Sequence, residues 1–287
     1  MGALRDRMEA DLKLLGRARR TQECYLRCAR HFAVYHGRSP EQMGEPEIRE
    51  YLLHLVEEKG VSPATHHMNV ASLKFLYKVT LRRPEAVEEV PFPKVPRRLP
   101  KILTGSEAMR LISCVTSISC RAIAAVIYGG GLRVAEACTL KPEDIDSARG
   151  LIHVRQGKGR KDREVMLGQK LLSLLREYWR AVRPSGEWLF PSKRSPSRHI
   201  HDRTVREALH KAAQAARLKR RVGPHLLRHR FATHLLELGY GVEIIQCLLG
   251  HASPRTTRRY TRLQAEFLRQ VTSPLDVAGT PEGDVLR

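Results

Sequence analysis

The chain has 287 residues, and its 51 Lys and Arg residues against 30 Asp and Glu residues give a formal net charge of +21 and an isoelectric point near 10.3. This length accommodates about two domains with their own cores, and the charge predicts a polyanionic partner such as nucleic acid, although RNA or an anionic membrane surface would satisfy it equally. No apolar run approaches the roughly 20 residues that span a bilayer, and the N-terminus is a charged amphipathic segment rather than a signal peptide, so we expect a cytoplasmic protein.

The six cysteines do not form a metal or disulfide framework. They lack paired Cys-x-x-Cys spacing and mostly fall among apolar helix positions. We therefore interpret them as reduced packing residues. These residues are Cys24, Cys28, Cys114, Cys120, Cys138 and Cys247.

The first third of the chain is predicted to be helical, because its apolar residues recur at a spacing of three to four. Thr21 and Ser62 are suited to begin two of these helices, since a hydroxyl oxygen accepts hydrogen bonds from free backbone N–H groups. Four helices predict a small bundle, which we assign to an N-terminal domain over residues 1–83. The helical segments are 4–15, 21–35, 45–58 and 62–79.

A basic, proline-rich connector is predicted over residues 84–104, where the prolines interrupt regular structure. It is either a solvated spacer or, in a protein that closes around a duplex, a segment that follows the phosphates. We favour the second interpretation. The cations that would contact these phosphates are Arg97, Arg98 and Lys101.

A glycine-rich turn presents an arginine near the start of the second domain, which we place at residues 105–272. Residues 129–131 are all glycine and end an apolar helix around residues 122–128. Arg133 then begins the next helix, where free N–H groups also favour a phosphate.

Two segments further along the chain alternate like strands. Residues 151–155 and 163–167 flank the basic, glycine-containing turn 156–162, which predicts a β-hairpin. Any cation here could contact a nucleic-acid backbone. The candidates are Arg155, Lys158, Arg160, Lys161 and Arg163.

Helices surround this hairpin in the predicted domain. One resumes near Ser106, another covers residues 167–182, and a third runs to about Ala216 from a cap at Asp202 or Thr204. Between the last two, the segment from Trp188 to Pro191 is predicted to be a buried anchor.

The segment from His225 to Tyr260 concentrates histidines and arginines on amphipathic helical sequence. On a helix, Leu227, Phe231, His234 and Leu238 form an apolar stripe, so His234 is most simply a hydrogen-bonded core residue. His225 and Arg228 are three residues apart on the opposite face and can hold one oxyanion between them.

A second short helix is predicted from Val242 to Leu249, ended by Gly250 in a left-handed cap. His251 follows at once, and Tyr260 lies on a basic segment without an evident core to fill. Taken singly, such a histidine or tyrosine is more often structural than catalytic.

Taken together, these residues resemble the motifs of the tyrosine recombinases, the lambda-integrase-like family. His225-x-x-Arg228, then Leu249-Gly250-His251, then Tyr260 follow the order of its C-terminal motif. Tyr128–Leu140 resembles its first arginine box, with Glu136 as the usual acidic neighbour of Arg133. Residues 20–77 more weakly resemble its SAM-like core-binding domain. The resemblance implies a mainly α fold with a small β-hairpin (α+β), in which two domains form a C-shaped DNA clamp.

The resemblance also implies a role for each catalytic candidate. Arg133 and Arg228 would clamp the scissile phosphate, Tyr260 would attack it with assistance from His225, Lys158 would protonate the leaving 5′ oxygen, and His251 would bind a nonbridging oxygen. The product would be a 3′-phosphotyrosyl link, and neither a metal, a cofactor nor ATP is required.

The partners expected from the resemblance are double-stranded DNA and further copies of the chain. A helix over residues 263–271 could dock on a neighbouring subunit in a homotetramer on two DNA sites, or pack on its own domain; without DNA we expect a monomer or dimer. A partner recombinase or accessory protein remains open, and no membrane partner is expected. Residues 273–287 are predicted to be a flexible tail.

Three other interpretations are compatible with the sequence. His199 and His201 fit a weak His-hydrophobic-His pattern of metal-dependent nicking enzymes, with Tyr260 as their nucleophile. Type IB topoisomerases share the recombinase chemistry, and a noncatalytic DNA-binding protein could share the fold. Within the family, the N-terminal part looks closest to integron integrases and related mobile-element enzymes. The short region before His225 and the unusual Arg230 depart from the integron integrases, so integron recombination in particular is not assigned.

Overall fold

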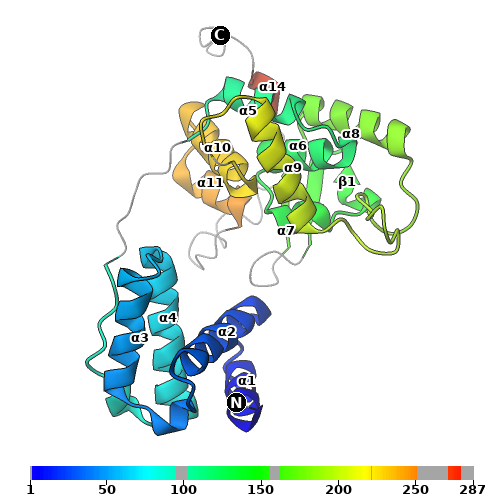
Figure 1. Ribbon diagram of the computed structural model, residues 1–287. Coiled ribbons are helices and arrows are strands. Elements are labelled where there is room, and N and C mark those ends of the chain that lie inside the picture. Colours follow the sequence, from blue (N-terminus) through cyan, green and yellow to red (C-terminus); the bar gives the residue numbers. More distant parts are fainter. Residues whose placement is uncertain (1, 95–101, 156–161, 221, 251–270, 279–287) are drawn as a thin grey trace. The chain divides into compact units, whose positions relative to one another are not determined.

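The computed structural model describes residues 2–94, 102–155, 162–220, 222–250 and 271–278. The chain divides into two compact units, Met1–Pro100 and Lys101–Arg287. Both are mainly helical, and the second contains a small antiparallel sheet (Figure 1). The predicted α+β class is therefore confirmed. No helix within the described ranges has the length and apolar character needed to cross a membrane.

The first unit is a helical bundle. Its helices are α1 (Gly2–Leu14), α2 (Arg19–His36), α3 (Glu45–Glu57) and α4 (Pro63–Phe75), with a π-helical turn η2 (Leu76–Thr80) and 3-10 turns η1 (Pro40–Gln42) and η3 (Pro84–Val87). Phe32 is fully buried between helices and meets the rings of Tyr51 and Tyr77 edge-on. These aromatic contacts build the centre of the bundle.

Of the two predicted helix caps in this unit, one is confirmed and one is wrong. The Ser62 hydroxyl accepts a hydrogen bond from the backbone N–H of Thr65, as expected. Helix α2 instead begins after Ala18, whose side chain makes no cap, so Thr21 lies inside the first turn. Ala18 has φ −57° and ψ 141°, which lie outside the helical region, so the helix starts at the next residue.

The connector is shorter than predicted, because both of its ends pack into a unit. Val87 and Val90 are buried in the core of the first unit, so the expected boundary at residue 83 falls inside that unit. At the other end, Leu103 is buried in the second core and Thr104 caps the next helix. Residues 95–101, with Arg97, Arg98 and Lys101, lie outside the described residues.

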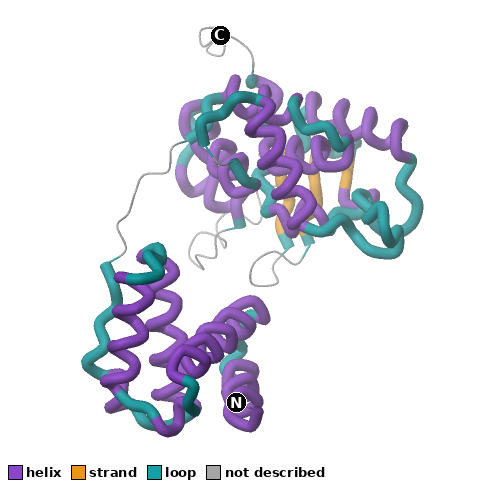
Figure 2. The backbone as a smooth tube through the Cα atoms, viewed as in Figure 1, coloured by secondary structure: helices purple, strands orange, loops and turns teal. Residues whose placement is uncertain are grey.

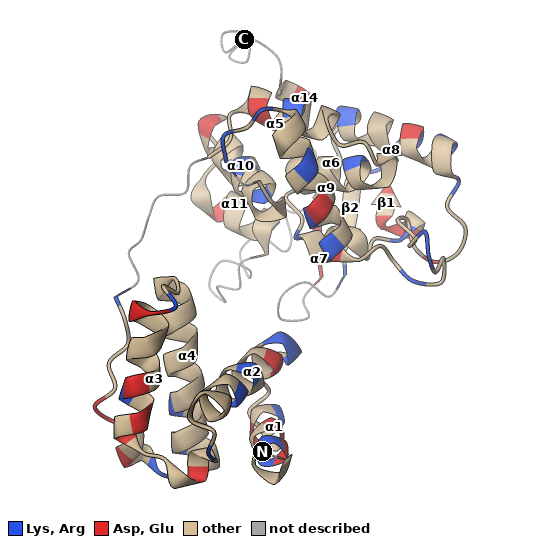
Figure 3. Ribbon diagram, viewed as in Figure 1, with Lys and Arg blue, Asp and Glu red and all other residues tan. Residues whose placement is uncertain are grey.

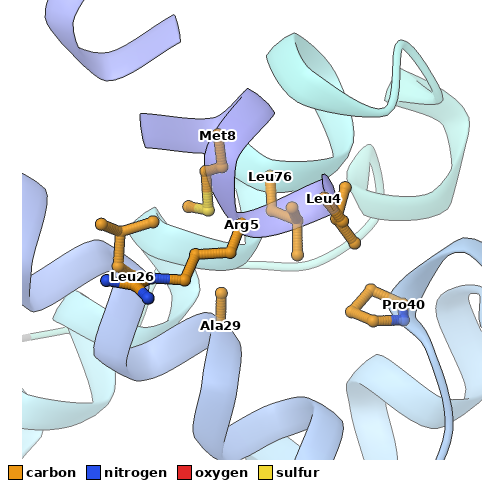
Figure 4. A pocket seen from close by; sticks show the side chains of 7 residues that line it. All are labelled: Leu4, Arg5, Met8, Leu26, Ala29, Pro40 and Leu76. Carbon is orange, nitrogen blue, oxygen red and sulfur yellow. The ribbon is translucent and has the colours of Figure 1, made fainter. Parts of the chain in front are cut away.

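A small apolar depression lies between the first helices of the bundle (Figure 4). Arg5 is the one charged side chain among its lining residues, so the depression offers no acid, base or nucleophile. We assign it no chemistry. Its lining consists of Leu4, Arg5, Met8, Leu26, Ala29, Pro40 and Leu76.

The second unit is built around one buried helix, α6 (Ile118–Gly130), whose residues from Ala122 onward are all buried. A helix that is apolar all round belongs in the centre of a fold. The surrounding helices are α5 (Gly105–Ser113), α7 (Val134–Cys138), α8 (Gln169–Val182), α9 (Asp202–Ala215), α10 (Pro224–Glu237), α11 (Val242–Leu249) and α14 (Pro274–Val277), with the 3-10 turn η4 (Pro142–Asp144).

The sheet contains the predicted hairpin and one further strand (Figure 2). Strands β2 (Leu151–Val154) and β3 (Arg163–Met166) pair antiparallel, with Ile152 opposite Val165. Strand β1 (Ile145–Asp146) pairs with the other edge of β2. Two residues are too short for an alternating pattern, which is why the sequence did not predict β1.

Residues 271–278 pack against the second unit, so the predicted flexible tail does not begin at residue 273. Leu275 is fully buried, and the Ser273 hydroxyl donates to the carbonyl of Gly129. The Asp276 carboxylate accepts from the backbone N–H groups of Gln169 and Lys170. Asp276 therefore supplies the N-terminal cap that α8 lacks in its own sequence.

Candidate active site

Arg133 is positioned by the turn that ends α6. Gly131 takes a left-handed conformation at φ 66°, and a Cβ atom there would lie 2.4 Å from the Phe231 ring. Only glycine fits both constraints. The chain then turns into α7 with Arg133 at its N-cap, as predicted, and the Arg133 backbone N–H donates to Glu136 Oε2 over 2.8 Å.

Three arginines surround Glu136, and we call this group the arginine cluster. Arg133 Nη1 lies 2.7 Å from Glu136 Oε1, Arg163 Nη2 lies 2.7 Å from Oε2, and Arg228 Nη1 lies 3.7 Å from Oε2. Burial by itself raises the pKa of Glu136, but hydrogen bonds and the charges of Arg163 and Arg133 outweigh it and lower the pKa to about 2. Glu136 is therefore a buried carboxylate at neutral pH.

The same arginines also bind the C-terminal end of α11. Arg163 Nε donates to the carbonyl of Leu248 over 2.9 Å. Arg228 Nη2 donates to the carbonyl of Leu249 over 2.5 Å, and Arg133 Nη2 donates to the carbonyl of Gly250 over 3.5 Å. These carbonyls have no partner within the helix, and the negative end of the helix dipole favours cations. The arginine cluster thus joins α7, β3, α10 and α11.

Arg228 is buried, although the helical pattern placed it opposite the apolar stripe of α10. Its guanidinium also donates to the carbonyl of Gly131 over 2.6 Å, which ties the two arginine motifs together. Burial and the nearby charge of Arg133 lower the pKa of Arg228 to about 10. The cation is retained near neutral pH, because both carbonyls and Glu136 stabilise it.

The arginine cluster has more positive than negative charge and is suited to bind an oxyanion. Three guanidinium groups face one carboxylate, and Arg133 keeps 22% of its side chain exposed. An arginine presents five N–H donors in a fixed plane, so donors remain beyond those used inside the protein. A phosphate at this position would meet charge that is already held in place.

Two of the three histidines of α10 differ as the helical pattern predicted. His225 is exposed in the first turn, three residues before Arg228. His234 is half-buried, with its Nδ1 3.0 Å from the Tyr128 hydroxyl, and burial lowers its pKa. His234 is therefore a packing residue, whereas His225 remains accessible.

Of the remaining predicted site residues, the structure describes Arg155 and Arg163. Arg155 is half-exposed on the hairpin, and it pairs with Asp144 over 2.6 Å and with Glu143 over 2.9 Å. Arg163, which we expected to contact DNA, has only 7% of its side chain exposed and is bound within the arginine cluster. Its long-range contacts have no local sequence signal, so the sequence did not predict its burial. Lys158, Arg160, Lys161, His251 and Tyr260 lie outside the described residues.

Positive charge in the first unit is concentrated on α2 rather than α3. Helix α2 carries four arginines and one glutamate, whereas α3 carries four glutamates and one arginine. Figure 3 shows this difference between the two helices. A polyanion would therefore be attracted to α2 and repelled by α3.

His199 and His201 have structural contacts. The His201 side chain accepts from the backbone N–H of Arg203 over 3.1 Å and caps α9, so the predicted caps Asp202 and Thr204 are wrong. His199 Nδ1 contacts the carbonyl of Ile200 over 2.9 Å. Within the described ranges, no group of three His, Cys, Asp or Glu residues is placed to hold a metal ion.

Comparisons with known proteins agree with this geometry. Residues 101–266 match the phage integrase family, and residues 4–86 match the phage integrase N-terminal SAM-like domain. A putative integrase/recombinase of Sinorhizobium fredii is 43% identical, covering 98% of this chain and 91% of the relative. The tyrosine recombinase XerA of Pyrococcus furiosus is 39% identical, covering 84% of this chain and 85% of the relative.

Solved structures show the same fold. A lambda integrase tetramer bound to a Holliday junction matches with a TM-score of 0.71 at 21% identity, covering 90% of this chain and 76% of that chain. The chain belongs to the phage integrase family. It is a tyrosine-type site-specific DNA recombinase, and the comparisons do not favour the topoisomerase or the noncatalytic binding protein.

Proposed function

We propose that the chain cleaves and rejoins DNA strands through a phosphotyrosyl intermediate formed by Tyr260. The Tyr260 oxygen would attack the scissile phosphorus, forming a 3′-phosphotyrosyl bond as the bond to the 5′ oxygen breaks. Lys158 would give that oxygen its proton, leaving a 5′ hydroxyl. Attack by a 5′ hydroxyl on the phosphotyrosyl bond reverses the step and releases the tyrosine, so no ATP, metal or other cofactor is needed.

The arginine cluster is the observation that carries this proposal. Negative charge grows on the nonbridging oxygens in the five-coordinate transition state, and Arg133 and Arg228 would supply fixed positive charge there. Loss of one such donor commonly costs about 3 kcal/mol of barrier, or about a hundredfold in rate. His225, exposed beside Arg228, would assist deprotonation of Tyr260, and His251 would bind a nonbridging oxygen.

The other proposed contacts follow the phosphate backbone. Arg155, Arg160 and Lys161 of the hairpin would bind DNA in the second unit, and the four arginines of α2 would do so in the first. Arg97, Arg98 and Lys101 in the connector would add sequence-independent contacts. Their loss should weaken binding at every DNA sequence and reduce its salt dependence.

We further propose that the chain acts as a homotetramer on two DNA sites through a Holliday junction, and as a monomer or dimer without DNA. The tetramer is supported by the fold shared with lambda integrase, for which a crystal structure of a tetramer bound to a Holliday junction has been solved. A cytoplasmic location would give access to DNA. The recombination event is of the integration or excision type performed by mobile elements. The proposal allows for a partner recombinase or an accessory protein.

Trapping on nicked DNA tests the proposal. A nick just 3′ of the scissile phosphate lets a short fragment diffuse away after cleavage, so the covalent intermediate accumulates. We expect a protease-sensitive adduct in EDTA with DNA flanking the gene, and none with Tyr260→Phe, whose binding should be unchanged. An adduct of equal yield with Tyr260→Phe would contradict the assignment of the nucleophile.

A further inference from the structure

We infer that Arg163 is a positioning residue for cleavage, which holds Glu136 and the end of α11 so that Arg133 and Arg228 meet the scissile phosphate correctly. The inference rests on the proposed roles of those two arginines. Arg163 itself would not touch the phosphate, because its side chain is 93% buried and engaged inside the cluster.

The contacts of Arg163 use its whole planar fork. Nη1 donates to Glu136 Oε1 over 3.1 Å and Nη2 donates to Oε2 over 2.7 Å, while Nε donates to the carbonyl of Leu248 over 2.9 Å. A bidentate pair fixes the plane of the carboxylate as well as its position. A lysine could supply positive charge at one point, but it could not bind both the Glu136 carboxylate and the Leu248 carbonyl in this planar geometry.

Glu136 transmits this constraint to the catalytic arginines. Its Oε1 also accepts from Arg133 Nη1, and its Oε2 lies 3.7 Å from Arg228 Nη1. Without Arg163, the carboxylate would be free to rotate and pair more closely with either arginine. That arginine would then be withdrawn from the phosphate, and the positive charge available to the transition state would fall.

The end of α11 is shaped around Arg163 as well. Gly250 has φ 61°, and a Cβ atom added there would lie 3.1 Å from Arg163 Cδ and 3.2 Å from its Nη1. The left-handed cap therefore brings the backbone directly against the guanidinium. Since His251 is the next residue in sequence, Arg163 fixes the point from which that catalytic candidate extends.

Arg163→Lys tests the inference, with Arg149→Lys as a matched control. Arg149 also pairs with carboxylates beside the sheet, Asp146 and Glu164, but it is 42% exposed and lies outside the arginine cluster. On nicked DNA we expect Arg163→Lys to form the adduct about 10- to 100-fold more slowly, because small displacements of catalytic groups have effects of this size. DNA affinity should be unchanged, and Arg149→Lys should react at the native rate.

A methylphosphonate at the scissile position separates positioning from a loss of stability. This group replaces one nonbridging oxygen with a methyl group, so the reacting centre is neutral and needs less positive charge. We expect most of the Arg163→Lys defect to disappear on this DNA, as it should for Arg133→Ala. A variant that is only less folded would remain equally slow on both DNAs.

The outcomes distinguish this inference from the proposed function. If the native chain forms no adduct, or if Arg133→Ala is not relieved by methylphosphonate, the proposed function fails. If both behave as expected but Arg163→Lys reacts at the native rate, or is equally slow on both DNAs, the inference is overturned. Should Arg163→Lys not fold, Arg163→Gln, which keeps a donor for Leu248, is measured in the same way.

Discussion

Replacing Glu136 with glutamine should destabilise the second unit in a pH-dependent manner. The change keeps the shape of the side chain but leaves three buried or half-buried arginines without their shared carboxylate. The pKa of Glu136 falls from its ordinary value of 4.5 to about 2 on folding. By linkage, a drop of this size contributes about 3 kcal/mol of stability at neutral pH.

The sign of the pH dependence follows from the lowered pKa. The contribution is fully present above pH 4.5, the ordinary pKa, and is lost as the pH falls through about 2. At about pH 3, roughly 2 kcal/mol of it should already be lost, so native and Glu136→Gln proteins should differ by only about 1 kcal/mol there.

Urea unfolding followed by tryptophan fluorescence measures this difference directly. The chain has two tryptophans, Trp179 and Trp188, and both lie in the second unit, so the signal does not report on the first. Glu143→Gln is the control, because Glu143 pairs with Arg155 on the surface with 61% of its side chain exposed. Such a pair is worth less than about 1 kcal/mol. The role of Glu136 would be contradicted if Glu136→Gln lowered the free energy of unfolding no more than Glu143→Gln does. It would also be contradicted if the difference between native and Glu136→Gln proteins did not become smaller in acid.

Three further predictions concern single substitutions. Gly131→Ala should cost about 2–4 kcal/mol, because of its left-handed backbone and the Phe231 ring, and an unchanged urea midpoint would contradict this. Asp276→Ala should lower the free energy of unfolding by about 1 kcal/mol, because α8 loses its N-terminal cap. Asp276→Asn should recover part of the loss in thermal melting, and equal melting temperatures for the native protein and both variants would contradict the capping role. Arg228→Lys should slow adduct formation about 100- to 1,000-fold with unchanged DNA affinity, and single-turnover rates equal to native would exclude its proposed role.

Local sequence signals predicted much of the fold. The spacing of apolar residues gave the helix from Val242 to Leu249, and Gly250 takes the left-handed cap expected of it. The glycines before Arg133 likewise end α6 as predicted, since only glycine adopts φ 66° without strain beside a packed ring. Such features depend on neighbouring residues and are therefore visible in the chain itself.

Features that depend on distant residues were not predictable in the same way. Arg163 looks like one more cation of a basic hairpin, and only the three-dimensional contact with Glu136 and Leu248 reveals its burial. Asp276 caps a helix that begins more than 100 residues earlier, in a segment whose composition suggested disorder. The side chain of His201, rather than that of Asp202, caps α9, because His201 Nδ1 lies within hydrogen-bond distance of the Arg203 backbone N–H.

The position of the covalent DNA link identifies the nucleophile. Adduct trapped on nicked DNA in EDTA would be digested with nuclease and trypsin, and the peptides carrying a residual nucleotide identified by mass spectrometry. Trypsin cuts after Arg259 and Arg262, so we expect the nucleotide on the peptide of residues 260–262, attached to Tyr260 through a 3′ phosphate. A nucleotide on another tyrosine, or an attachment through a 5′ phosphate, would contradict this expectation.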